Sequence, residues 1–127
     1  WYGCYRNLFE TSSHETYGTG DHGLATSDMR RCWDWYLDGH SDPVYGDLSA
    51  ADMVGLPPCY LGEAELDCLA DDTKWLGGLL AGAGVRHSYE LYPDVNHGFV
   101  HFGQYYAPSF QALESAAHFL KSPGKLR

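Results

Sequence analysis

The pattern of apolar and polar positions is irregular in the first part of the chain and regular in the second. Residues 10–27 have no clear period and are rich in Ser, Thr, Gly and His, which predicts a long surface loop. Helical spacing then predicts an amphipathic helix over residues 28–38. Its apolar positions are Met29, Cys32, Trp33, Tyr36 and Leu37. Turn-forming residues follow, so we expect residues 10–58 to be a loop-rich segment with one helix.

Residues 58–122 alternate between strand-like and helical patterns. The predicted elements are a strand at 58–66, a helix at 71–83, a strand at 86–92, a loop at 94–104 and a helix at 107–121. In the last helix the apolar positions at helical spacing are Phe110, Leu113, Ala117 and Leu120. This order predicts an α/β fold in which helices flank a mostly parallel sheet.

Composition and charge narrow the classes of function. With 44% hydrophobic and 20% charged residues, the chain has the composition of a folded globular domain. A net charge of −9 disfavours binding to nucleic acid or to an anionic membrane surface. No apolar run approaches the roughly 20 residues that span a bilayer. The four cysteines form no C-x-x-C pair, so we expect no zinc site. They are too sparse for a disulfide scaffold, so we expect reduced thiols and a cytoplasmic location.

Candidate chemistry lies where the two predicted strands end. Asp67 follows the first strand, and His97 follows the second. Ligands of open α/β sheets bind outside the carboxyl ends of the strands, so we expect these two side chains to meet there. A carboxylate bound to one imidazole nitrogen fixes the tautomer and leaves the other nitrogen to accept a proton from a hydroxyl. The pair therefore predicts general-base chemistry.

Other residues compete for these roles. Asp71 and Asp72 are alternative acids, although carboxylates also suit the start of a helix. His101 is an alternative base, whereas His87 lies at the wrong end of its strand. Three loop histidines near aspartates raise the question of a metal, but they lack ligand spacing, and we predict no metal and no cofactor. They are His14, His22 and His40. Neither Cys59 nor Cys68 has a base placed to make it a nucleophile.

The chain resembles the hormone-sensitive-lipase family of microbial esterases, which have the α/β-hydrolase fold. The matching blocks are Trp33-Asp34-Trp35-Tyr36-Leu37, Asp42-Pro43, residues 51–58, residues 64–71, Ala83-Gly84-Val85, Tyr92 and His97-Gly98-Phe99. The resemblance implies that Asp67 is the acid and His97 the base of a catalytic triad. It also implies that the region of Trp33 and Tyr36 borders the acyl side of the site. We take Trp33, Tyr36 and Phe99 as candidate substrate-binding residues, with a place in the core as the alternative.

The family's nucleophile is a serine in a G-x-S-x-G elbow, and its oxyanion hole comes from an H-G-G-G-type loop. Neither motif occurs in these 127 residues. The opening residues, Trp1 to Tyr5, are typical of the end of a buried strand. We therefore expect residues 1–127 to be the C-terminal part of one α/β-hydrolase domain, inactive alone. An upstream part, on the same or a second chain, would supply the serine and the oxyanion hole.

Three functions follow from this pattern. The first is hydrolysis of short- to medium-chain carboxylic esters by a Ser-Asp-His triad to which this chain supplies Asp67 and His97. The second is a non-catalytic binding or regulatory module, or an inert fragment, that lacks the nucleophile. The third is a metal-dependent hydrolase. A homo-oligomer remains compatible with each of them.

Overall fold

A computed structural model describes residues 1–41, 46 and 48–121. The Asp42-Pro43 block and residue 122 lie outside the described residues. The elements in chain order are α1 (Ser12–Tyr17), α2 (Thr26–Leu37), the 3-10 helix η1 (Ala50–Met53), β1 (Cys59–Leu66), α3 (Ala70–Gly82), β2 (His87–Asn96), the 3-10 helix η2 (Phe99–Tyr105) and α4 (Ala107–Lys121). Within the described part of the chain, no helix is both long and apolar enough to cross a membrane.

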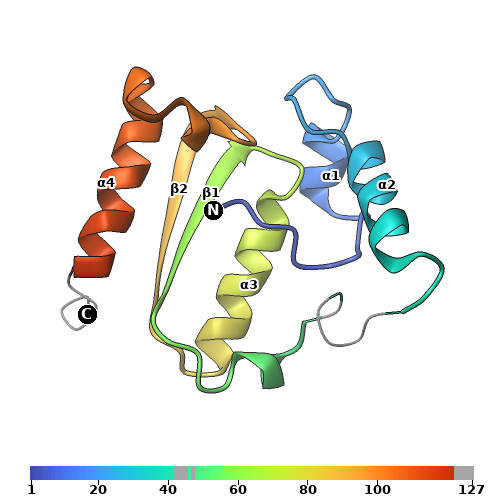
Figure 1. Cartoon of the computed structure of the whole chain (residues 1–127), viewed down its shortest axis with the longest axis horizontal. Coiled ribbons are helices and arrows are strands. Elements are labelled where there is room, and N and C mark those ends of the chain that lie inside the picture. Colours follow the sequence, from blue (N-terminus) through green and yellow to red (C-terminus); the bar gives the residue numbers. More distant parts are fainter. Residues whose placement is uncertain (42–45, 47, 122–127) are drawn as a thin grey trace.

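The sheet consists of β1 and β2, which pair in parallel and are connected by α3. Figure 1 shows α3 on one side of the two strands and α4 on the other, so the predicted α/β layering is confirmed. Each face of the sheet has its own apolar cluster. The cluster toward α3 consists of Met53, Leu61, Leu80 and Val85. The cluster toward α4 consists of Ala64, Tyr92, Val95, Phe99 and Ala112.

The face that α4 buries differs from the prediction. Its buried residues are Ser109, Ala112, Ala116 and Phe119, one position before the predicted row. In that predicted row, Phe110, Leu113 and Leu120 remain 47%, 39% and 74% exposed. The helix has two apolar rows, and the one with smaller side chains near its start lets it approach the sheet closely. Periodicity alone does not choose between two such rows.

The loop predicted over 10–27 contains a helix. Thr11 caps α1, because its side chain accepts a hydrogen bond from the backbone of His14. The only buried residues of α1 are Ser13 and His14, so this six-residue helix has no apolar row that a periodicity search would detect. Residues 10–58 therefore contain two α-helices and a 3-10 helix among the described residues, where one helix was predicted.

The second strand extends beyond its predicted end. Ala64 pairs with Tyr92 but Leu66 pairs with Asn96, so β2 has two extra residues at a bulge. In this bulge Asp94 has a positive φ of 55°, and its backbone N–H donates to Glu65 at 2.9 Å. Pro93 and Asp94 are residues that usually end strands, which explains why the sequence pattern predicted a loop from residue 94.

The first residues lie beside β1. The backbone N–H of Tyr2 donates to the carbonyl of Gly62 at 3.0 Å, although residues 1–5 do not form a regular strand. The indole of Trp1 packs over Gly62, where the Cβ of any larger residue would lie 2.3 Å from the ring. Glycine at this position lets the N-terminal segment contact the sheet directly and brings Tyr2 toward the carboxyl ends of the strands.

Candidate active site

Asp67 and His97 meet at the carboxyl ends of the two strands. Leu66 and Asn96 form the last pair of the sheet register, and the next residue on each strand is Asp67 or His97. Oδ2 of Asp67 lies 2.8 Å from Nδ1 of His97. The Asp67 side chain is completely buried, whereas 31% of the His97 side chain is exposed. The carboxylate is therefore shielded from solvent, whereas part of the imidazole is accessible at the surface.

The Asp67 carboxylate is held by its own turn. Its second oxygen, Oδ1, accepts a hydrogen bond from the backbone of Leu69 at 2.9 Å. Leu69 is the N-cap of α3, so the carboxylate lies at the positive end of that helix, where negative charge is stabilised. One oxygen is thus fixed by the backbone, and the other is left to hold the imidazole.

An aromatic ring supports the imidazole from another side. The ring centroids of Tyr2 and His97 are 4.7 Å apart. Tyr2 also contacts Phe99, and Gly98 has the left-handed φ of 80° that reverses the chain directly after His97. Burial raises the pKa of the Tyr2 hydroxyl, so this ring stays neutral. With Nδ1 bound to Asp67, Nε2 is the nitrogen left to exchange a proton with a reactant.

The rival acids have other partners. Both Asp71 and Asp72 lie in the first turn of α3, as the sequence predicts. Asp72 forms an ion pair with Arg6 at 2.8 Å, and Asp71 accepts a hydrogen bond from the backbone of Ser13 at 2.9 Å. Each of them holds an upstream segment against α3. Neither is the carboxylate that contacts His97.

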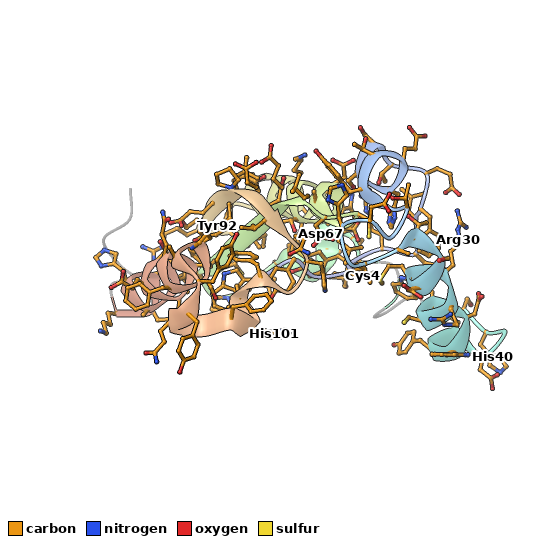
Figure 2. All side chains as sticks on the ribbon, turned by 90° about the horizontal axis from the view of Figure 1, so that it is seen from above. Cys4, Arg30, His40, Asp67, Tyr92 and His101 are labelled. Carbon is orange, nitrogen blue, oxygen red and sulfur yellow. The ribbon has the colours of Figure 1, made fainter. Side chains whose placement is uncertain are left out.

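The rival histidines are also placed elsewhere. His101 is exposed on η2, apart from Asp67 in Figure 2, and its ring forms no hydrogen bond within the described part of the chain. His87 starts β2, and its Nδ1 lies 3.0 Å from the carbonyl of Val85. His14 is buried with its Nδ1 2.8 Å from the Thr26 hydroxyl, and burial lowers its pKa. His40 lies at the far end of α2 from Asp67 (Figure 2).

The rival chemistries would use a cluster of metal ligands or a reactive thiol. Across residues 1–41, 46 and 48–121, no group of three or more His, Cys, Asp or Glu side chains is arranged to hold a metal ion. The four cysteines are free thiols. Burial raises the pKa of Cys68 to about 12, so this thiol beside Asp67 is protonated and a poor nucleophile.

A pocket lies between the N-terminal segment and α2. Its volume is about 250 Å³, and its lining residues are Cys4, Met29, Cys32, Trp33 and Tyr36. The Trp33 indole N–H lies 3.1 Å from the sulfur of Cys4, and its ring meets that of Tyr36 edge-on. The N-terminal segment that contributes Cys4 to this pocket also carries Tyr2, whose ring packs against that of His97. The structure thus brings two of the candidate substrate-binding residues together in one apolar pocket.

The third candidate, Phe99, has a different position. It is 0% exposed and belongs to the apolar cluster between the sheet and α4. A side chain without exposed surface does not contact a substrate, so Phe99 is a core residue here. The sequence pattern placed it in a loop, where burial is not readable. Three lining residues were not predicted to bind substrate: Cys4, Met29 and Cys32. The sequence placed Cys4 only in the strand-like opening segment, and it placed Met29 and Cys32 only among the apolar positions of the predicted helix.

A family model and a curated relative each match most of this chain. A family model described as the alpha/beta hydrolase fold matches residues 2–101. An acetyl esterase of Salmonella paratyphi B is 30% identical over 122 residues, which are 94% of this chain but 38% of that protein. The chain thus spans about two fifths of the length of the curated relatives it matches.

Solved structures of esterases also superimpose on most of this chain. A thermostable esterase from Pseudomonas putida superimposes with a TM-score of 0.82 and 25% identity, over 99% of this chain and 41% of that one. A hyperthermophilic esterase from the archaeon Pyrobaculum calidifontis has a TM-score of 0.74 and 27% identity, over 91% of this chain and 39% of that one.

Proposed function

Because this chain belongs to the α/β-hydrolase fold family, we propose that it is the part of a serine-dependent carboxylic-ester hydrolase that supplies the acid and the base. The observation that carries the proposal is the 2.8 Å contact between Asp67 and His97 at the strand ends. The two esterases described above superimpose on 99% and 91% of this chain, which supports an ester as the substrate class.

The proposed reaction uses both nitrogens of His97. A serine Oγ, supplied by an upstream part of the enzyme, attacks the ester carbonyl carbon while Nε2 takes its proton. Asp67 keeps the Nδ1–H directed toward itself and stabilises the positive imidazolium. The imidazolium then gives its proton to the departing alcohol, which leaves a serine ester. Water attacks that ester in the same manner, and the carboxylic acid is released. The oxyanion hole is also assigned to the upstream part.

One alternative has an observation in its favour. No G-x-S-x-G motif occurs in these 127 residues, which is compatible with a non-catalytic module. The two functions differ in whether a reactive serine accompanies this chain. A fluorophosphonate probe forms a stable adduct with such a serine and with little else, so it separates them.

The deciding experiment is fluorophosphonate labelling of the protein as isolated, followed by denaturing mass spectrometry. We expect an adduct on a polypeptide that contains or accompanies this sequence, and no adduct on the 14.2 kDa species itself. A sample with ester hydrolysis but no adduct would exclude the serine mechanism. A single unlabelled 14.2 kDa species without hydrolysis would favour the non-catalytic module.

The pocket beside α2 leads to a prediction about chain length. Tyr36 lines it and is 56% exposed, so Tyr36→Ala enlarges the pocket without opening the core. Each additional buried methylene contributes about 0.8 kcal/mol, or roughly fourfold in affinity. A butyrate ester has two more methylenes than an acetate ester, so we expect the ratio of their kcat/KM values to rise by about 4- to 15-fold. Tyr105→Ala is the control, since Tyr105 is 90% exposed and outside the pocket. An unchanged ratio in Tyr36→Ala would exclude this pocket as the acyl site.

A further inference from the structure

Two helices begin against each other beside Asp67. Helix α3 has no side-chain cap of its own, and its N-cap is the apolar Leu69. The backbone N–H of Asp71 instead donates to the hydroxyl oxygen of Ser13 at 3.2 Å. In return the backbone N–H of Ser13, in α1, donates to the Asp71 carboxylate at 2.9 Å. Each helix thus supplies the acceptor for an unsatisfied N–H at the start of the other.

The Ser13 hydroxyl makes another contact. It donates to the backbone carbonyl of Cys68 at 2.7 Å, in a buried position. A hydroxyl has one donor and two acceptor sites, so this bond and the bond from Asp71 are compatible. We call the contacts among Ser13, Cys68 and Asp71 the Ser13 clasp. It joins α1 to a turn more than fifty residues later in the chain.

The clasp acts on the peptide that follows the candidate acid. Cys68 comes directly after Asp67, and the Asp67 carboxylate is bound to the backbone of Leu69, one residue further on. Any shift of this turn therefore moves the carboxylate relative to His97. A displacement below 1 Å would take the 2.8 Å contact outside the usual range for a strong hydrogen bond.

The negative charge of Asp71 also stabilises the Ser13 clasp. Burial alone would raise the pKa of Asp71, but hydrogen bonds from Ser13 and an ion pair with Lys74 lower it below its ordinary value. The Lys74 ammonium lies 3.2 Å from the Asp71 carboxylate. Asp71 is consequently ionised at neutral pH, and its carboxylate is an acceptor for the Ser13 backbone N–H.

We propose that Ser13 is a positioning residue for the Asp67–His97 pair, because its hydroxyl fixes the Cys68 carbonyl and so holds the Asp67 carboxylate against the imidazole. Its effect on catalysis rests on the proposed ester hydrolysis. Its effect on the Asp67–His97 hydrogen bond does not. Without the hydroxyl, the Cys68 carbonyl and the Asp71 N–H lose their partners, and the turn relaxes to satisfy them.

The test compares Ser13→Ala with Ser12→Ala, a matched control, because Ser12 is the exposed neighbour of Ser13 on the same helix. The first readout is the downfield proton NMR resonance of His97 Nδ1–H in the protein as isolated. We expect this resonance in the wild type and in Ser12→Ala, and its loss or marked broadening in Ser13→Ala. Circular dichroism verifies that both variants fold.

The second readout is ester hydrolysis. We expect kcat to fall about 10- to 100-fold in Ser13→Ala with KM unchanged, since a misplacement near 1 Å costs about that much. A purely structural serine would lower stability but leave the resonance and kcat of the folded protein as in the wild type, and that result would overturn the proposal. If the wild type hydrolyses no ester, the resonance still decides the role of Ser13, whereas the proposed function fails.

A milder variant, Asp71→Asn, keeps the proposal testable if Ser13→Ala does not fold. Asp71→Asn keeps an oxygen acceptor for the Ser13 N–H but removes the charge. We expect it to fold, to broaden the His97 resonance and to lower kcat less than Ser13→Ala does. A resonance and a kcat equal to those of the wild type in Asp71→Asn, together with a misfolded Ser13→Ala, would overturn the proposal.

Discussion

Replacing His97 with alanine or Asp67 with asparagine is expected to lower kcat for the proposed ester hydrolysis by about 10⁴-fold or more, with KM little changed. The size follows from serine-protease triads, where asparagine in place of the acid costs about 10⁴ in kcat. The physical reason is the 2.8 Å bond between Oδ2 of Asp67 and Nδ1 of His97. An amide at position 67 permits the wrong imidazole tautomer, and alanine at 97 removes the base. Steady-state kinetics on a chromogenic ester measures both effects.

The matched control for the base is His101→Ala. This exposed histidine was the rival base, and it should retain activity close to that of the wild type. The opposite pattern, with His97→Ala active and His101→Ala inactive, would transfer the role of base to His101. The rate of fluorophosphonate labelling provides a second measurement, because it also depends on deprotonation of the serine. It should fall in His97→Ala and in Asp67→Asn.

The sequence was informative about the candidate pair because parallel strands place their ends at a common edge. Asp67 and His97 follow strands of regular pattern, and the last pair of the register, Leu66 with Asn96, brings them together. The bulge in β2 was not predictable, because Pro93 and Asp94 carry the composition of a loop. It nevertheless matters, since the two extra residues set the register that aligns Asp67 with His97.

Other features of the structure could not be predicted from the sequence, each for a physical reason. The Ser13 clasp joins single polar residues far apart in the chain, and no periodicity marks such a contact. The burial of Phe99 depends on which way η2 turns after Gly98, which composition does not reveal. In α4 the sequence offered two apolar rows, and only packing against the sheet selects the one that contains Phe119.

The acids near the start of α3 could not be told apart from the sequence alone. Three acids lie within six residues there, and all of them suit the positive end of a helix. The structure gives each a different partner: His97 for Asp67, Ser13 for Asp71 and Arg6 for Asp72. Sequence alone ranked them by motif. Their partners come from segments before and after α3, so only the tertiary structure separates the candidate acid from the two acids that hold the N-terminal segments.

Asp72→Ala is expected to destabilise the fold by about 3–5 kcal/mol, the usual cost of removing one partner from a buried ion pair. Asp72 is 1% exposed and accepts hydrogen bonds from the guanidinium of Arg6 at 3.0 and 2.8 Å. It also accepts from the backbone N–H groups of Tyr5 and Arg6 at 2.9 and 3.3 Å. Alanine leaves all four donors without this acceptor in a partly buried position. Urea denaturation followed by tryptophan fluorescence measures the loss.

Asp28→Ala is the matched control, because it also removes an aspartate from an Asp–Arg pair. Asp28 and Arg31 are 40% and 57% exposed, so this change should cost less than about 1 kcal/mol. Equal stability losses in the two variants would contradict the role of Asp72. The consequence reaches the candidate site, since the segment held by Asp72 also carries Tyr2, whose ring packs against His97. In the folded fraction of Asp72→Ala, the Nδ1–H resonance of His97 should therefore broaden, whereas Asp28→Ala should leave it sharp.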